Sequence, residues 1–420
     1  MSNIILTLLI LLLCSIVLVE IRGGHIVVSD PADVSGTSYV DMFLTSYPIA
    51  VGGNRPAFEI FGNHSDLLKS IITKGKGYMD GGEPRGIPPS NWAKIAKPDG
   101  SGHVAFFNYK SIHRCQQKAM VGSSIVDSIN VVELRIKFNN EPEFYMSRTA
   151  VAERISIHSV TTPAKEIYVV KKVIDRFTDN QGAHSDVRII PFKRECKYLS
   201  NGPGLKDAHY VAAGSLHDRH WQEKQFLSVL DNEYNVVASW VLRDPETAKS
   251  LTRPQKNWLP FWDKCKLILS KRFGPEHVVG EFNEWKSKDK EIDIPNLITS
   301  PSPARVPNPY MIRGSAPPVH HPLLDADYAI GCVHLRGKLK VYRHSLYVVE
   351  TKYPYNIVSY SPLFSFKPYR DIEFVMSLNP LPDGSLELTH GSMDCEPRIA
   401  IFNRTYIEEN FKAYLKLSFD

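Results

Sequence analysis

Short apolar runs that end at turn-forming residues follow one another along most of this chain of 420 residues. The runs are rich in β-branched and aromatic residues and are closed by Gly, Pro, Asn or Asp, which is typical of short antiparallel strands with tight turns. We expect strands at 103–109, 128–138, 154–159, 166–173, 187–192, 209–214, 225–230, 236–242 and 266–270. The pattern predicts an all-β fold.

The last third of the chain shows the same pattern at the most even spacing, with runs at 313–319, 328–334, 341–350, 357–361, 371–374 and 386–394. Arg, His, Tyr and Asp stand among its apolar residues, and these are the side chains that a carbohydrate or phosphate site needs. Helical periodicity is confined to 245–250 and the C-terminal stretch 407–417. The spacing suits a barrel, a sandwich or a propeller.

An apolar run over residues 4–19 opens the chain and is broken only by Thr7, Cys14 and Ser15. It is slightly short for a membrane-spanning helix and long for the core of a signal peptide. Because no small-x-small cleavage pattern follows, we expect an uncleaved signal anchor in residues 1–23, with a removed signal peptide as the alternative. Residues 24–100, rich in Gly, Pro and Ser, are expected to form a stem and capping segment before a catalytic domain at 101–420.

Charge and cysteine content narrow the class of protein further. The net charge of +5 is spread along the chain and gives no reason to expect a nucleic acid partner. Five cysteines outside the apolar run lie far apart without a Cys-x-x-Cys pair, so zinc is not expected. Glycosylation acceptors at Asn63 and Asn403 agree with a lumenal or extracellular body, in which up to two disulfides could form between partners that the spacing leaves open.

Seven short motifs follow one another between about residue 100 and residue 405. They are Phe107-Asn-Tyr-Lys-Ser-Ile112, Glu133-Leu-Arg135, Ser185-Asp-Val-Arg188, Lys256-Asn-Trp-Leu-Pro-Phe261, Arg313-Gly-Ser-Ala-Pro317, the strand that ends in His334, and Gly391-Ser-Met-Asp394. In this order they resemble the β-mannoside phosphorylases and related β-mannosyltransferases. The resemblance implies an all-β, five-bladed β-propeller, to which the periodicity of 407–417 adds a short C-terminal helix. Ser185 and Val187 depart from the family, which carries an acid and a Pro at these positions.

The resemblance also implies which residues carry the chemistry. Inversion at an anomeric carbon needs proton transfer at one oxygen and charge stabilisation at the other. Asp186 matches the catalytic carboxyl of the family, and Arg135, Arg188 and His334 are the candidates for binding phosphate oxygens. The alternative is that Asp186 and Arg188 form only a structural turn pair.

Two further groups are candidates for contacts with a sugar. Lys256, Asn257 and Trp258 join a cation, an amide and an aromatic face, which suits a sugar ring and its hydroxyls, although Trp258 could equally be a core residue.

Tyr342 and His344 share one face of an alternating strand and are taken as binding residues, whereas Arg343 lies on the other face. Asp394 is the last predicted binding residue, and it is the next carboxyl to consider if Asp186 has no catalytic role.

Two other motifs suggest different chemistry, and a third is absent. Asp325-Ala-Asp327 is a DxD triplet of the kind that holds manganese and a nucleotide diphosphate in α/β glycosyltransferases, but it follows a His-Pro loop in a region poor in helices. His320 and His321 are adjacent in a Pro-rich loop, which indicates a solvated loop rather than a metal pair. The sequence contains no Gly-x-Ser-x-Gly elbow, so it gives no support for a Ser-His-Asp hydrolase.

We therefore predict a glycosyltransferase that transfers a hexose, mannose in first place, from a nucleotide sugar to a glycan acceptor with inversion and without a metal cofactor. Its membrane anchor at 4–19 places it in the Golgi or endoplasmic reticulum with a lumenal catalytic domain, or, if cleaved, outside the cell. The anchor also favours a transferase over a phosphorylase. The alternatives are a phosphorylase or hydrolase of β-mannosides, a manganese-dependent DxD transferase, and a non-catalytic carbohydrate-binding propeller.

Overall fold

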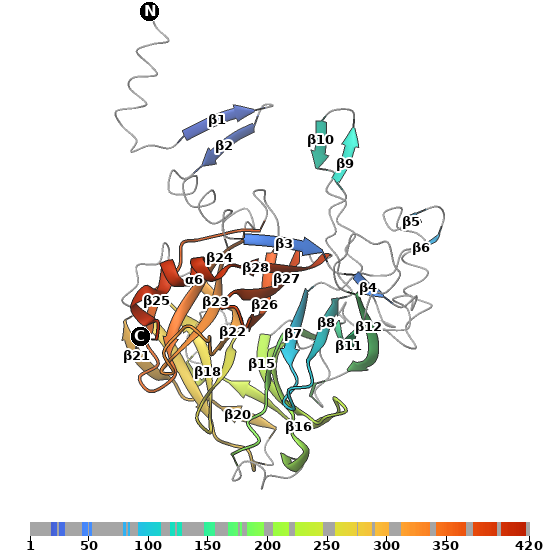
Figure 1. Cartoon of the computed structure of the whole chain (residues 1–420). Coiled ribbons are helices and arrows are strands. Elements are labelled where there is room, and N and C mark those ends of the chain that lie inside the picture. The colour runs from blue at the N-terminus through green and yellow to red at the C-terminus, as the bar shows by residue number, and fades with distance from the viewer. Residues whose placement is uncertain are drawn as a thin grey trace, which may run out of the picture.

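A computed structural model gives the fold of the chain (Figure 1). It describes residues 18–22, 25–29, 44–48, 50–52, 79–80, 83–84, 91–110, 118–121, 124–127, 147–155, 167–174, 177–178, 183–196, 205–217, 223–246, 257–274, 276–287, 290–301, 312–336, 342–366, 373–392 and 396–416. Statements below that something is absent refer to these residues.

The described strands form a β-propeller in which successive antiparallel sheets surround a common axis (Figure 1). The first sheet contains β7 (Asn91–Ala96), β8 (His103–Lys110), β11 (Ser147–Ile155) and β12 (Ile167–Ile174), with β4 (Ala50–Gly52) added in parallel at its edge. The second contains β13 (Ala183–Pro191), β14 (Tyr210–His217), β15 (Glu223–Leu230) and β16 (Val236–Arg243), with β20 (Glu291–Asp293) added in parallel.

Two further sheets follow in chain order. The third contains β17 (Leu259–Asp263), β18 (Lys266–Phe273), β19 (Glu276–Phe282) and β21 (Leu297–Pro301). The fourth contains β22 (Ile312–Val319), β23 (Tyr328–Arg336), β24 (Tyr342–Glu350) and β25 (Ile357–Tyr360). Each of these first four sheets takes the antiparallel strands of a blade from one continuous part of the chain.

The last sheet is composite. It contains β26 (Glu373–Pro380), β27 (Leu386–Ser392) and β28 (Glu396–Phe402), and its fourth strand is β3 (Leu44–Pro48) from the other end of the chain. The first strands of the sheets contact one another in the order β7, β13, β17, β22, β26 and back to β7. The predicted all-β propeller is confirmed, and β3, β4 and β7 show that residues 24–100 contribute strands to it.

Short hairpins and one helix complete the described structure. The hairpins are β1 (Leu18–Arg22) with β2 (His25–Ser29), β5 (Met79–Asp80) with β6 (Glu83–Pro84), and β9 (Lys118–Val121) with β10 (Ser124–Asp127). The helix α6 (Arg404–Phe411) begins at Asn403, whose side chain accepts a hydrogen bond from Tyr406 N (3.0 Å), as N-cap residues do. A 3₁₀ turn (Lys412–Tyr414) follows, so the predicted C-terminal helix is confirmed.

Several sequence-based expectations fall outside the described residues. They include residues 4–17 of the apolar run, the strand expected at 128–138 and most of the helix expected at 245–250. Leu18 and Val19, the last residues of the apolar run, lie in β1. No helix among the described residues has the length and apolar character that crossing a membrane requires.

The hydrophobic core lies between neighbouring sheets rather than on one side of each. One cluster joins the second and third sheets, with Leu227, Trp240 and Phe282 among its members, and another joins the fourth and last sheets with α6. Because blades are covered on both faces, strands such as β23 are buried from Ala329 to Leu335 instead of alternating between buried and exposed residues. This explains why the sequence shows apolar runs without a clean two-residue period.

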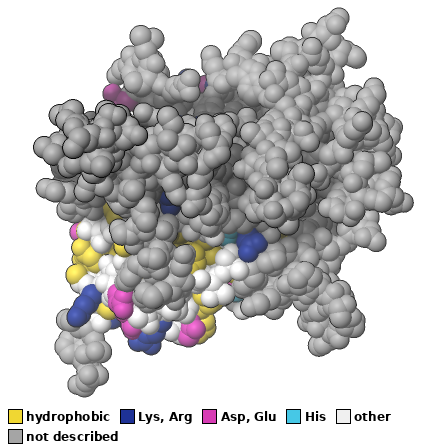
Figure 2. All heavy atoms as spheres, turned by 90° about the horizontal axis from the view of Figure 1, so that it is seen from above, with side chains coloured by type: hydrophobic (Ala, Val, Ile, Leu, Met, Phe, Trp, Pro, Cys, Tyr) yellow, Lys and Arg dark blue, Asp and Glu magenta, His cyan; other side chains and the backbone are white. Residues whose placement is uncertain are grey.

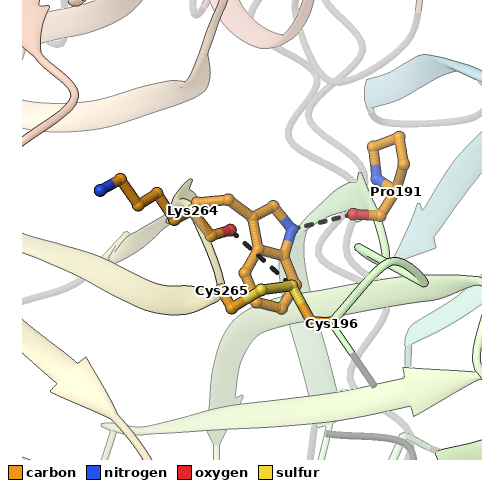
Figure 3. Close-up of a disulfide and its surroundings, with 5 residues drawn as sticks. Pro191, Cys196, Lys264 and Cys265 are labelled. Atoms are coloured by element: carbon orange, nitrogen blue, oxygen red, sulfur yellow. Dashed lines mark hydrogen bonds between the residues drawn. A yellow bond between two sulfur atoms is a disulfide. The ribbon is translucent and has the colours of Figure 1, made fainter. Parts of the chain in front are cut away.

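A disulfide joins the second and third sheets (Figure 3). Cys196 follows β13 and Cys265 lies in the turn between β17 and β18, 69 residues further on. The indole of Trp262 donates a hydrogen bond to Pro191 O (3.0 Å) beside it. Closing a loop of this length restricts the unfolded chain and is worth about 4 kcal/mol in the chain-entropy account. The bond resolves one pairing that the sequence leaves open, and Cys332 is buried as a free thiol.

His277 of β19 makes the stability of the fold depend on pH. Its ring is fully buried between Ser270 Oγ (3.0 Å) and Tyr355 O (2.7 Å), and burial lowers its pKa from 6.5 to about 4. In the unfolded chain this histidine takes up a proton near pH 6.5, whereas in the fold it does so only near pH 4. Stability from this group is therefore fully present above pH 6.5 and is lost as the pH falls towards 4.

We expect His277→Gln to flatten this pH dependence. The wild-type free energy of unfolding should fall by about 3 kcal/mol more than that of the variant between neutral pH and pH 4, because the variant has no proton to bind at this position. Urea unfolding at a series of pH values measures the difference. Parallel pH profiles for the two proteins would contradict the prediction.

Candidate functional site

The first residues of the inner strands meet at one end of the propeller axis. Asp186 near the start of β13 accepts a hydrogen bond from Asn91 at the start of β7. Arg188 reaches the other three strands: it contacts Asn257 just before β17, the Gly314 carbonyl of β22, and the Phe374 ring of β26. Five segments distant in the sequence thus surround one point, and we take this end as the candidate site.

A bulge in β13 sets the direction of Asp186. The pairing of β13 with β14 shifts between Ser185 and Arg188, so two residues of β13 lie opposite one residue of β14. Asp186 has a φ of 54°, a left-handed conformation that Asp adopts more readily than most residues. Its neighbours Ser185 and Val187 are buried, while Asp186 is partly exposed. The bulge therefore turns this carboxyl out of the sheet, as bulges beside functional sites often do.

Arg188 occupies a different place from the one predicted for it. Its guanidinium is fully buried and donates to the carbonyls of Asp186, Gly314 (3.4 Å) and Ser315 (3.1 Å) and to Asn257 Oδ1 (3.2 Å). Burial lowers the pKa of Arg188 to about 10, against the opposing effect of the Asp186 charge. Because these protein acceptors use its donors, Arg188 ties β13 to β17 and β22 and does not present a fork to a phosphate.

Asn257 and Trp258 are adjacent in the chain, but Asn257 lies at the site and Trp258 lies in the hydrophobic core. Asn257 is buried with a φ of 65°, and it helps to hold Arg188. A Cβ at Gly314 would lie 2.4 Å from Asn257 O, so only glycine lets β22 approach this segment. Trp258 is a core residue, 3% exposed, with the Lys271 ammonium 4.8 Å from its ring centroid. The core position, weighed as the alternative for Trp258, is the one that the structure shows.

His334 on β23 and Tyr342 and His344 on β24 lie beside the site, with His334 and His344 buried. His334 lies opposite Arg313 on one side and His344 on the other in the strand register, and its ring stacks on Tyr342 with 5.4 Å between centroids. Burial lowers the pKa of His334 well below 6.5, and nearby His344 and arginines lower it further. Burial likewise lowers the pKa of His344 to about 3. Both imidazoles are therefore neutral near pH 7.

Arg313 is the cation that the sequence analysis missed. It is the second residue of β22, is partly exposed, and lies close enough to His334 to affect its pKa. Arg313 belongs to the Arg-Gly-Ser-Ala-Pro motif of the resemblance, whereas the predicted phosphate ligands are Arg135, Arg188 and His334. The signal that could have identified Arg313 is its place at the start of an inner strand, next to the glycine that allows close approach.

Asn91 and Asn108 were also missed. Asn91 Nδ2 lies 3.5 Å from Asp186 Oδ1, and Asn108 Nδ2 donates to Asn91 Oδ1 (2.6 Å).

Three of the predicted site residues, Arg135, Lys256 and Asp394, lie outside the described residues.

The DxD triplet lies at the other end of the propeller. Asp325 and Asp327 belong to the turn that follows β22, whereas Arg313 and the site lie where β22 begins. Asp325 Oδ1 accepts a hydrogen bond from Asp327 N (3.0 Å), and Asp327 pairs with Lys352. No group of three His, Cys, Asp or Glu within the described part of the chain could hold a metal ion. The hydrogen bond and the ion pair of these two acidic residues stabilise a turn.

The adjacent histidines differ from the expected solvated loop in one respect. His320 is exposed, but His321 is buried, and its Nδ1 accepts a hydrogen bond from Leu323 N (3.3 Å). His321 therefore shapes the turn that leads to Leu324 rather than facing solvent.

Figure 2 shows the molecule from above. The described side chains on this face are a mixture of hydrophobic, basic, acidic and histidine residues, and they form no large patch of a single charge.

The chain has low similarity to known proteins. No family model and no curated protein matches it. Among solved structures, it is similar to a GDP-Man-dependent mannosyltransferase from Leishmania mexicana, with a TM-score of 0.45, 11% identity, and coverage of 89% of this chain and 94% of that chain. A β-1,2-mannobiose phosphorylase from Listeria innocua gives a TM-score of 0.44 and 9% identity over 78% of this chain and 97% of that chain. Values of this size do not establish a shared activity.

Proposed function

We propose that the chain is a carbohydrate-active enzyme that transfers a hexose, mannose in first place, from a nucleotide sugar to a glycan acceptor with inversion. The observation that carries the proposal is the placement of Asp186. This partly exposed carboxyl belongs to a bulge residue in the left-handed conformation, at the point where the five inner strands meet. The buried guanidinium of Arg188 donates a hydrogen bond to its backbone carbonyl. Conformations of this kind persist at functional sites because the surrounding structure enforces them.

The residues at the site fit a single displacement. The acceptor hydroxyl forms a bond to the anomeric carbon on one face while the bond to the leaving phosphate oxygen breaks on the other, and the electron pair leaves with the phosphate. The hydroxyl proton passes to the Asp186 carboxylate, directly or through a sugar hydroxyl. Arg313 is the partly exposed cation that offsets the charge of the leaving group. Partly exposed Tyr342, whose ring stacks on buried His334, offers a stacking surface to a sugar.

A phosphorylase is the second candidate, because inorganic phosphate could occupy the place of the leaving group in the same site. The two reactions are separated by incubating the full chain with nucleotide sugars and acceptor glycans, and in parallel with β-mannosides and inorganic phosphate. The proposal expects glycan extension. Release of mannose 1-phosphate without extension would favour the phosphorylase, and inactivity in both assays would favour a binding protein.

Two structural proposals accompany this function. We propose that the composite sheet of β26, β27, β28 and β3 is the fifth blade, which closes the ring against β7. We also propose a lumenal enzyme with an uncleaved anchor at residues 4–19, a location that the Cys196–Cys265 disulfide supports because disulfides are rare in reducing compartments. The purified protein should then retain its first residues and resist alkaline carbonate extraction. A soluble product that begins near Gly23 would contradict the anchor.

We expect catalysis without a metal ion. Activity should survive EDTA, and replacing both Asp325 and Asp327 by Ala should leave turnover within about twofold, because the two residues form a turn far from Asp186. The measurement is turnover with and without chelator for both proteins. Loss of activity in EDTA that manganese restores would support the DxD alternative instead.

A further inference from the structure

The carboxyl of Asp186 is connected to a chain of two asparagine amides that comes from the neighbouring sheet. Asn91 is the first residue of β7, and Asn108 faces it in the register of β7 with β8. Both are buried, 1% and 3% exposed, although neither has an apolar side chain. Burying two amides is unfavourable unless they are hydrogen-bonded, so their positions require an explanation.

The chemistry of the groups fixes the direction of the hydrogen bonds. An ionised carboxylate can only accept, so Asn91 must turn its NH₂ group towards Asp186 Oδ1, which lies 3.5 Å from Nδ2. Asn91 Oδ1 then points the other way and must be an acceptor. Asn108 supplies the donor, with its Nδ2 2.6 Å from that oxygen. Reversing either amide would place two acceptors or two donors against each other.

We propose that Asn91 and Asn108 are positioning residues that hold the Asp186 carboxyl in its reactive orientation and favour its ionised form. Asn108 locks the orientation of Asn91, and Asn91 donates to the carboxylate. The distance of 3.5 Å between Asn91 and Asp186 is at the long limit for a hydrogen bond, and such contacts in a free enzyme often shorten when substrate binds. The inference rests on the proposed catalytic role of Asp186.

Other titratable groups lie at this end of the propeller and must be considered before a pH effect is assigned to the amides. They are Arg188 on β13, Arg313 on β22, His334 on β23, His344 on β24 and Glu373 on β26; Asn257 and Trp258, at this end of β17, do not titrate. Arg188, whose pKa burial lowers to about 10, stays charged near pH 7, and the two histidines stay neutral because burial lowers the pKa of each far below its usual value. A limb of the activity profile that moves in an Asn108 variant therefore reports on a carboxyl, Asp186 or Glu373, and Asp186 is the one in hydrogen-bond contact with Asn91.

Asn108→Asp is the sharpest test because it keeps the shape and reverses the polarity. The new carboxylate would draw the NH₂ group of Asn91 towards itself and leave Asn91 Oδ1 facing Asp186. Since the Asp186 carboxylate would lose a donor and gain a repulsive neighbour, the acidic limb of kcat/KM should move up by about 1 pH unit. The value of kcat at neutral pH should fall about tenfold, with KM for the donor nearly unchanged. Asn108→Ala should produce a smaller shift in the same direction.

Asn379→Ala is the matched control. Asn379 is a buried asparagine, 8% exposed, that donates to Glu387 Oε1 (3.1 Å) in the last sheet and has no hydrogen bond to the site. It should lower the melting temperature as Asn108→Ala does and leave the pH limb in place. A pH profile that does not move in either Asn108 variant would overturn the positioning role. Absence of hexosyl transfer by the wild-type chain would overturn the proposed function instead, so the two failures are distinguishable.

Discussion

Replacing Asp186 by Asn is expected to lower the turnover of hexosyl transfer by about 10²–10⁴-fold, the usual range for loss of general acid–base assistance. The substitution keeps the size of the side chain and its ability to accept from Asn91, so the bulge and the fold should persist. Asn also adopts the left-handed conformation that φ = 54° requires. Turnover measured beside a circular dichroism melt separates chemistry from stability.

Asp99→Asn provides the control for this change. Asp99 lies in the exposed turn before β8, where its Oδ1 accepts from Ser101 N (2.9 Å), and it should have no effect on turnover. If Asp186→Asn retains near-normal turnover in a folded protein, the bulge is structural. Asp394 would then be the next carboxyl to test.

Arg188→Lys should have the largest effect on stability. Lysine keeps the charge, but its compact ammonium cannot span acceptors on three segments, and each buried acceptor left without a donor costs about 1–3 kcal/mol. We expect a loss of about 3 kcal/mol or more in the free energy of unfolding. Turnover should fall as well, because Arg188 holds the backbone carbonyl of Asp186.

Arg343→Lys is the matched control for this second prediction. Arg343 is partly exposed and donates to Ser365 Oγ (3.3 Å) from its Nη1, and its replacement should change stability by less than about 1 kcal/mol. An Arg188→Lys variant with normal stability and a strongly raised KM for the sugar-phosphate substrate would show that Arg188 binds phosphate. That result would contradict its role in tying β13 to β17 and β22.

Strand content and order could be predicted from the sequence, whereas the closure of the ring could not. The runs at 209–214 and 225–230 correspond to β14 and β15 because each is an apolar segment between turn residues. The pairing of β3 with β28 joins residues about 350 positions apart, and no local pattern records such a contact. Nor does the composition of 24–100, with its Gly, Pro and Ser, distinguish a stem from a segment that lends strands to the propeller.

The sequence could indicate only some properties of the candidate site, again because contacts between distant segments decide the others. Asp186, Asn257, His334 and Tyr342 were selected from motifs, and the structure places residues of these motifs around one point. Burial determines what each residue can do there, and burial depends on distant segments. Arg188 and Arg313 have the same side chain, yet one is enclosed by carbonyls and the other is partly exposed. Sequence alone gave no reason to separate them.

The most direct measurement of the central claim is proton NMR of the anomeric configuration in the product of the full chain. Wild-type protein, supplied with the nucleotide sugar that it uses, should form a glycosidic bond with the configuration opposite to that of the donor, and Asp186→Asn should form almost none. This outcome is expected because one displacement assisted by one carboxyl inverts the centre. Retention of the donor configuration, or equal product from the Asp186→Asn variant, would contradict the account.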